Sequence, residues 1–124
     1  MMDKSEFAKC LDCMCLAARK RAQEMTRFYD DRLRAHGLTI NQFSMLTTLI
    51  LAGALPIASL AERLGIDRTT MSRNLALGEA AGWVTVAAGD DRRVRMVAIT
   101  KDGRHRAEAA LPAWREAQMH FADH

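Results

Sequence analysis

Three thiols lie close together near the N-terminus of this 124-residue chain, at Cys10, Cys13 and Cys15. Because thiolates bind soft metals and react with oxidants, the cluster predicts either a metal site or a redox switch. On one helix Cys13 lies about 60° and Cys15 about 140° from Cys10, since each residue turns roughly 100°. Three thiolates then reach one metal only through an unwound segment or a second subunit, and no Cys or His pair supplies a fourth ligand. We therefore expect no metal and no cofactor, and thiols buried on a dimer face as small apolar side chains are the alternative to a switch.

A second group of side chains that could do chemistry is basic. Residues 58–106 hold 9 basic and 6 acidic side chains, and arginine is far commoner there than lysine. A planar guanidinium binds phosphate or a guanine edge through two hydrogen bonds at once, as a nucleic-acid partner would require. Charge alone, however, favours a solvated surface. The candidate contacts form one cluster with hydroxyls and one in a polar turn: Arg68, Thr69, Thr70, Ser72, Arg73, Arg92 and Arg93.

Each cluster also has a purely structural interpretation. Thr69 and Thr70 could complete the start of a helix, and the aspartates at 90 and 91 could pair with the two arginines that follow them. At the turn we favour a mixed arrangement, in which one aspartate orients one arginine and the other arginine stays free.

No pattern in the chain predicts an enzyme, a membrane span or a secretory signal. A phosphate loop, paired carboxylates and zinc spacing are all missing, and no His lies near the thiols in sequence to act as their base. Apolar runs stay below the 18 or so residues of a transmembrane helix. The charged residues Asp3, Lys4 and Glu6 precede any apolar patch, unlike a signal peptide. We expect a cytoplasmic, non-enzymatic protein with no membrane partner and with reduced thiols.

The elements that position these side chains follow from apolar spacing. An apolar stripe through Phe7, Leu11, Met14 and Tyr29 predicts one helix over residues 5–35, which ends at Gly37. At 1.5 Å per residue this helix would be about 45 Å long, too long to bury its stripe inside so small a domain. We expect it to pack partly against a second subunit.

The middle of the chain predicts three shorter helices, over residues 40–52, 57–64 and 68–81. Thr39 and Asp67 are the expected N-caps, Gly65 separates the last two helices, and Pro56 belongs to an extended linker. Two short helices joined by so tight a turn are typical of a helix-turn-helix.

After Gly82 the pattern changes to that of β-strands. Residues 83–86 and 94–99 predict a two-stranded hairpin with a basic tip. Thr100 should cap a final helix, with Gly103 in its first turn and Pro112 as a kink or restart. The fold class is therefore mainly α with a small β-hairpin wing, a winged helix-turn-helix.

Such a lobe suits double-stranded DNA. A helix over residues 68–81 would fit the major groove and present its N-terminal side chains to base edges. The hairpin tip would reach the adjacent minor groove, where narrow A·T tracts concentrate negative potential. The alternative from another class is a winged-helix module that binds proteins and makes no contact with DNA.

Residues 57–75, IASLAERLGIDRTTMSRNL, resemble the helix-turn-helix of MarR-type transcriptional regulators. Residues 91–103 are similar to the wing and the start of the last helix of that family. The resemblance covers nearly the whole chain and implies a single domain over residues 1–124. Segments 1–36 and 101–124 would be dimerisation helices and residues 39–100 the DNA-binding lobe. It also implies a homodimer on a pseudo-palindromic operator, most often a repressor that is released by a small-molecule effector or by thiol chemistry.

Residues 15–29 resemble the first helix of the organic-peroxide-sensing branch of the same family. The resemblance places Cys15 on the reactive thiol and Tyr29 on a tyrosine that bonds it, with Cys10 or Cys13 as a resolving thiol. Ile40 and Arg19 stand where that branch has two further tyrosines, so the thiolate would lose a stabilising hydroxyl, which the charge of Arg19, one turn after Cys15, would partly offset.

The recognition helix also departs from the family at one position. Gly78 stands where the family usually has a leucine, so we expect the helix to lose a core side chain there. A local shift that brings in Leu77 is the compensation that we predict.

Overall fold

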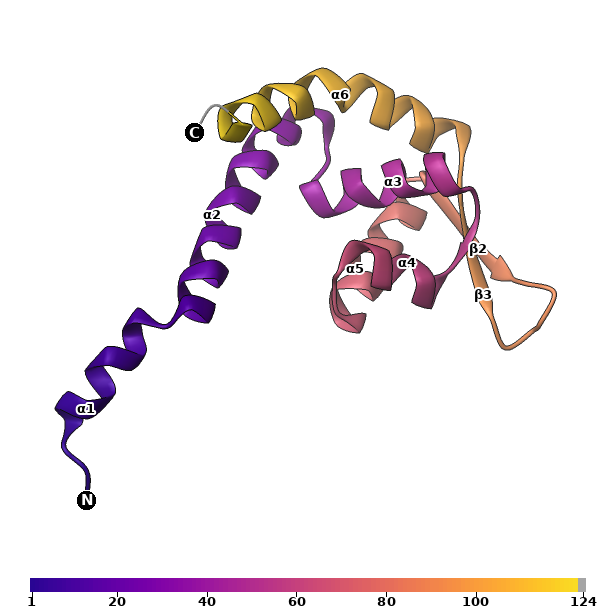
Figure 1. The fold of residues 1–124 in the computed structure, drawn as a ribbon. Coiled ribbons are helices and arrows are strands. Elements are labelled where there is room, and N and C mark those ends of the chain that lie inside the picture. Colours follow the sequence, from indigo (N-terminus) through magenta and orange to yellow (C-terminus); the bar gives the residue numbers. More distant parts are fainter. Residues whose placement is uncertain (123–124) are drawn as a thin grey trace.

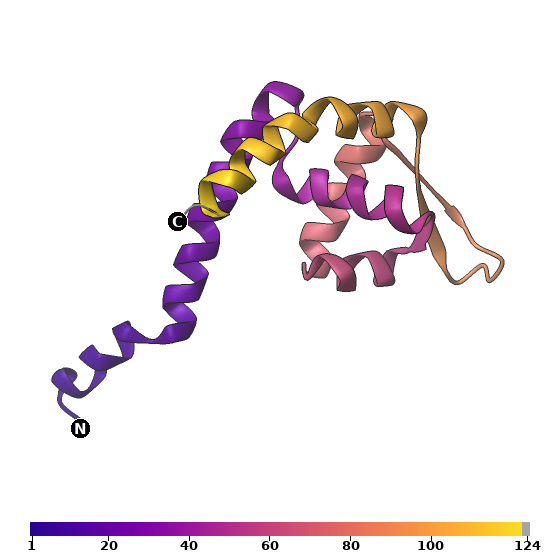
Figure 2. The same cartoon turned by 45° about the horizontal axis from the view of Figure 1, so that its top comes forward.

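The computed structural model describes residues 1–122 as a helical chain with one small sheet (Figure 1). A long N-terminal arm leads away from a lobe that contains the sheet, and the C-terminal helix joins the two (Figures 1 and 2). The elements are α1 (Lys4–Ala8), η1 (Lys9–Asp12), α2 (Met14–Leu33), η2 (Arg34–His36), α3 (Ile40–Ala52), β1 (Leu55–Pro56), α4 (Ile57–Leu64), α5 (Arg68–Ala80), β2 (Val84–Ala88), β3 (Arg95–Ile99) and α6 (Lys101–Ala122).

Side-chain caps fix the starts of α3, α5 and α6, at the residues that the sequence predicted. Thr39 accepts the N–H of Gln42, whose own side chain accepts the Thr39 N–H, which completes a capping box at α3. The Thr100 hydroxyl accepts the Gly103 N–H at 3.0 Å at the start of α6. Gly65 ends α4 at φ +64°, a left-handed conformation that a residue without Cβ adopts at little cost. The predicted helix-turn-helix, α4 and α5, is confirmed.

The sheet has three antiparallel strands in the order β1-β3-β2. The predicted hairpin is confirmed as β2 and β3, and β1 is a third strand that the prediction did not include. The missing strand is the segment that was expected to be an extended linker, and Leu55 pairs with Val97. Proline is tolerated at Pro56 because β1 lies at the edge of the sheet, where a missing N–H breaks no ladder.

The core of the lobe lies between the helices α3 to α6 and the sheet. Its fully buried side chains include Leu46, Leu60 and Val97. Gly78 is buried, and a Cβ there would lie 3.0 Å from Val84 Cγ2 and 3.2 Å from Met45 Cε. These two side chains fill the space at Gly78, so no core side chain is missing. Leu77 remains 51% exposed, and the predicted compensation by Leu77 is wrong.

The N-terminal arm breaks at Cys13, so the prediction of one helix over residues 5–35 is also wrong. Cys13 has an extended backbone, with ψ 131°, between the 3-10 turn η1 and the start of α2. The apolar side chains of Phe7, Leu11 and Met14 are exposed. Within residues 1–122 nothing buries this N-terminal part of the stripe, and a short isolated helix is marginal in water.

Helix α6 runs without interruption from Lys101 to Ala122, and the predicted restart at Pro112 does not occur. Pro112 is exposed, so water can bond the carbonyl group that the missing proline N–H leaves free. The second half of α6 lies along α2, where Glu116 pairs with Arg32 at 3.4 Å (Figures 1 and 2). Within residues 1–122, no helix is both long and apolar enough to cross a bilayer.

Candidate nucleic-acid interface

The start of α5 presents polar side chains to solvent. Arg68, Thr69, Ser72 and Arg73 are exposed, whereas the opposite face of the helix packs in the core through Met71 and other residues. This amphipathic division matches the prediction that the leading end of the helix faces outwards. The exposed end is therefore available to a ligand without any change of fold.

Asp67 holds the first turn of α5 in place. Its carboxylate accepts the Thr70 N–H at 2.7 Å. This backbone hydrogen bond and the Thr70 hydroxyl lower the pKa of Asp67, with a smaller contribution from the positive charge of Arg73. A lowered pKa means that the cap is fully present above the ordinary carboxyl pKa and is lost only as the pH falls through the lowered value. Thr70, which is half-buried, thus helps to hold the helix start and also keeps part of its surface exposed.

The wing tip shows the mixed arrangement that the sequence favoured. Asp91 accepts the backbone N–H of Arg93 at 3.0 Å and pairs with its guanidinium at 3.3 Å. The backbone hydrogen bond is the main cause of the lowered pKa of Asp91, followed by the side-chain bond. The Arg93 side chain is still 90% exposed, so the pair orients it without covering it. Arg92 is exposed and has no hydrogen-bond or ion-pair partner within residues 1–122.

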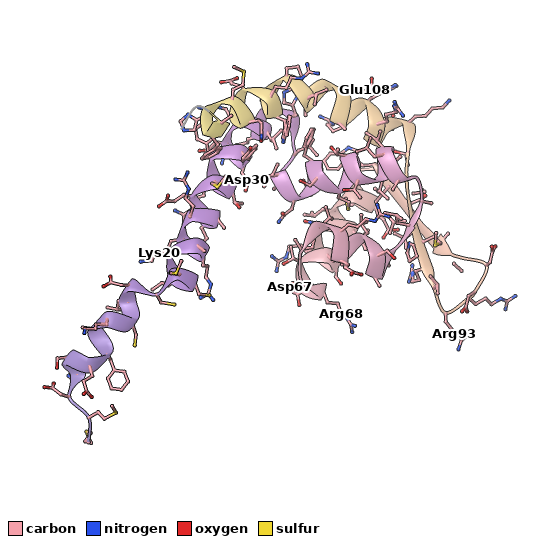
Figure 3. The ribbon with its side chains drawn as sticks, in the orientation of Figure 1. Lys20, Asp30, Asp67, Arg68, Arg93 and Glu108 are labelled. Atoms are coloured by element: carbon pink, nitrogen blue, oxygen red, sulfur yellow. The ribbon has the colours of Figure 1, made fainter. Side chains whose placement is uncertain are left out.

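The two clusters lie on one side of the molecule. Figure 3 shows Arg68 and Arg93 projecting from the same face, with Glu108 on the opposite one. A groove of about 770 Å³ runs between α4, α5 and the wing, and its walls include Arg68, Ser72 and Arg93. The structure thus brings together side chains that are more than 20 residues apart in sequence.

Arg95 lines the same groove, and sequence reasoning did not select it as a site residue. It is the first residue of β3 and is exposed, while Val97 two residues later is fully buried. The sequence gives little indication of this, because residues two apart in a strand point to the same face of the sheet, and Arg95 would then be expected on the buried face with Val97. Arg95 is exposed because it lies at the end of the twisted strand, beyond the core that covers Val97.

The three thiols cluster around the break in the arm, and all three are exposed. The Cys13 N–H donates to the Cys10 carbonyl at 3.3 Å, and Cys15 lies in the first turn of α2. Burial of the thiols as small apolar side chains on a dimer face would require a second copy of the chain. In the described part of the chain, no group of three His, Cys, Asp or Glu side chains has the geometry to hold a metal ion.

Tyr29 does not meet Cys15 within one chain. The two residues are on the same helix, 14 positions and therefore about 21 Å apart along its axis. Tyr29 is buried instead between α2 and α6, where its hydroxyl donates to Gln118 Oε1 and its ring stacks on Phe121. Burial raises the pKa of this tyrosine. Any bond between the Cys15 thiol and the Tyr29 hydroxyl requires a second copy of the chain.

A separate pocket of about 430 Å³ lies where α6 crosses α3 and α4. Phe43 and Trp114 form aromatic walls, with ring centres 6.3 Å apart, and Leu64 and Leu111 add apolar surface. The polar groups on its lining include the Arg63 guanidinium and the Thr47 hydroxyl. A mostly apolar pocket with a few polar groups is typical of small-molecule sites.

Known proteins share both the sequence pattern and the fold. A sequence model of the MarR family matches residues 36–94. The crystal structure of the M. tuberculosis transcriptional regulator MosR in complex with DNA is 37% identical, with a TM-score of 0.82, over 90% of this chain and 81% of MosR. Overoxidized AbfR bound to DNA, at 24% identity and a TM-score of 0.76 over 92% of this chain and 85% of AbfR, shares the fold.

A curated relative also carries a helix-turn-helix description. YwoH, an HTH-type transcriptional regulator of Bacillus subtilis (strain 168), is 28% identical over 79 residues, which are 64% of this chain. The matched region spans 58% of the length of YwoH. The helix-turn-helix of α4 and α5, the three-stranded wing and these matches agree with one another: the chain belongs to the MarR family of winged helix-turn-helix transcriptional regulators.

Proposed function

We propose that this regulator binds double-stranded DNA in a sequence-specific way, and that it acts as a dimeric repressor. The observation that carries the proposal is the common face of the exposed start of α5 and the basic wing tip (Figure 3). MosR, which is similar over 90% of this chain, was crystallised with DNA. In this proposal Arg68, Thr69, Thr70, Ser72 and Arg73 face the major groove, and Arg92 and Arg93 reach the minor groove.

The proposal divides the chain into the DNA-binding lobe over residues 39–100 and dimerisation helices over residues 1–36 and 101–124. The last two residues of that second segment lie outside the described part of the chain. The arm leaves apolar side chains uncovered, among them Leu11 at 74% and Met14 at 87% exposure. A second copy of the chain would bury this surface. A two-fold dimer predicts a pseudo-palindromic operator with half-sites about 10 bp apart.

Retention on random duplex DNA at low salt, together with the mass of the particle by light scattering, tests the proposal. Binding to phosphates releases counterions, so we expect retention that falls steeply as salt rises, and the mass of a dimer. A monomer that passes through a duplex-DNA column at low salt would instead support the winged-helix module that binds proteins. The Arg92 guanidinium is exposed and has no partner within residues 1–122, which favours a DNA-binding protein over a winged-helix module that binds proteins.

Arg92→Ala is expected to weaken binding to the operator by about 1–3 kcal/mol, as the loss of a charged groove contact does. The substitution removes an exposed side chain without an ion pair, so the fold and the Asp91–Arg93 pair should remain intact. Fluorescence-anisotropy titration of a labelled operator duplex measures the change. Wild-type affinity in this variant would remove Arg92 from the interface.

Release of the repressor by thiol oxidation is the first of two routes to regulation. Three exposed thiols at a break in the proposed dimer arm favour it, because oxidation there would change a surface that the dimer needs. We expect a hydroperoxide or diamide to lower the DNA affinity of the wild-type protein but not that of Cys15→Ser. Gel shifts of both proteins, before and after the oxidant and after reduction, measure the effect. Equal loss of affinity in the two proteins would exclude Cys15 as the sensor.

A small-molecule effector is the second route, and the pocket at Phe43 and Trp114 favours it. The pocket lies between α6, which belongs to the proposed dimer body, and helices α3 and α4 of the lobe. A ligand held there would contact both parts and so bias their relative position, which sets the separation of the two recognition helices. Its aromatic walls and the Arg63 guanidinium suit a molecule with an apolar ring and a negative charge.

A further inference from the structure

The groove between α5 and the wing carries positive charge and no negative charge on its walls. Three guanidinium groups line it, Arg68 from α5, Arg93 from the wing tip and Arg95 from β3, and no Asp or Glu is among its lining residues. Ser72 adds a hydroxyl, and the rest of the lining is apolar and includes Ile57 and Val94. An open groove of this composition fits a chain of anionic groups joined by apolar sugar rings.

The proposed docking geometry indicates that the anionic chain in the groove is a DNA backbone. In B-DNA a major groove and its neighbouring minor groove are separated by one sugar-phosphate backbone. If α5 occupies the major groove and the wing tip the adjacent minor groove, that one backbone must pass between them. The space between α5 and the wing tip is the groove itself, and its walls hold Arg68 and Arg93 from the two sides.

We infer that this groove holds the backbone of one DNA strand, and that Arg95 is a phosphate contact in it. The inference rests on the proposed DNA-binding function. It adds Arg95 to the interface and separates the residues that contact phosphates from those that contact bases. Arg68 and Ser72 also line the groove, so we assign them, like Arg95, to contacts with phosphates. Arg73 does not line the groove, so we assign it to contacts with bases. Phosphate contacts fix the register of the protein on the duplex but carry no sequence information.

Arg95→Gln tests the assignment because it removes the charge and keeps a polar side chain of similar length on the strand. Two labelled duplexes are titrated over a range of salt concentrations: one of random sequence and one selected by the wild-type protein from a random pool. We expect affinity for both duplexes to fall by the same factor, about tenfold at low salt, and the salt slope to drop by about one for each subunit in contact. Arg95→Lys keeps a positive charge that can pair with phosphate, so it should restore most of the affinity and most of the salt slope.

Arg104→Ala is the matched control for net charge. Arg104 forms a 3.0 Å ion pair with Glu108, which lies on the opposite face from Arg68 and Arg93 (Figure 3). This control should bind both duplexes like the wild type. Unchanged affinity and salt slope in Arg95→Gln would overturn the assignment, and so would a loss confined to the selected duplex, which would make Arg95 a base contact. Failure of the wild-type protein to bind either duplex would instead contradict the proposed function itself.

Discussion

Arg73→Ala is expected to abolish the preference of the protein for its operator over random DNA, while the fold and the dimer persist. Arg73 is an exposed side chain in the second turn of α5, and its charge is close enough to Asp67 to lower the pKa of that carboxyl group. A bidentate arginine on guanine contributes about 1–3 kcal/mol of discrimination. A dimer loses this contact in both half-sites, which amounts to about 2–6 kcal/mol, or at least ~30-fold. Competition gel shifts with unlabelled random duplex measure the preference.

Arg73→Lys is the matched variant, because it keeps the charge but loses the planar fork that guanine requires. We expect it to retain binding to random duplex and to lose most of the preference for the operator. Circular dichroism and light scattering on both variants confirm that helix content and dimer mass are unchanged. An operator affinity equal to that of the wild type in Arg73→Ala would refute the role of this residue.

Gly103→Ala is expected to destabilise the protein by about 3 kcal/mol, the upper part of the range for overpacked sites. A Cβ on Gly103 would lie 2.2 Å from the Trp83 carbonyl oxygen and 2.9 Å from Ile99 Cγ1. The carbonyl is backbone and is already an acceptor for the Thr100 N–H at 2.9 Å, so it cannot move aside cheaply. The substitution therefore strains the junction at which the wing continues into α6.

Lys101→Ala provides the control for this prediction, since Lys101 is exposed and lies in the same helical turn. Urea unfolding is compared at one protein concentration, because the stability of a dimer depends on concentration. Gly103→Ala should show a clearly lower midpoint at the same m-value, and Lys101→Ala a midpoint within error of the wild type. Equal midpoints for Gly103→Ala and the wild type would show that α6 can shift away from Trp83 without cost.

The lobe could be predicted from sequence because local signals and burial agree there. Thr39, Asp67 and Thr100 are strong N-cap residues, and each one starts a helix in the structure. The polar turn at the wing tip also carries its own determinant, since Asp91 bonds the backbone two residues further on. Local chemistry of this kind does not depend on the rest of the fold.

The remaining features depend on contacts that a pattern cannot contain. The apolar spacing of residues 5–35 is helical, but a single chain offers no surface for Phe7 or Leu11, and the arm breaks at Cys13. The edge strand β1 is only Leu55–Pro56, too short to show a period, and it exists because β3 passes beside it. Likewise Arg95 joins Arg68 at one groove only through tertiary packing of the wing against the helix-turn-helix.

The central claim is that a dimer binds a pseudo-palindromic operator through α5 and the wing. Footprinting of the protein on duplexes that it selects from the genomic DNA of its source organism tests this claim most directly. Hydroxyl-radical cleavage reads protection of each sugar along both strands. We predict two symmetric regions of protected sugars about 10 bp apart on the wild-type complex, and loss of this protection in Arg73→Ala. A single asymmetric region, or no protection at a salt concentration at which the dimer is intact, would contradict it.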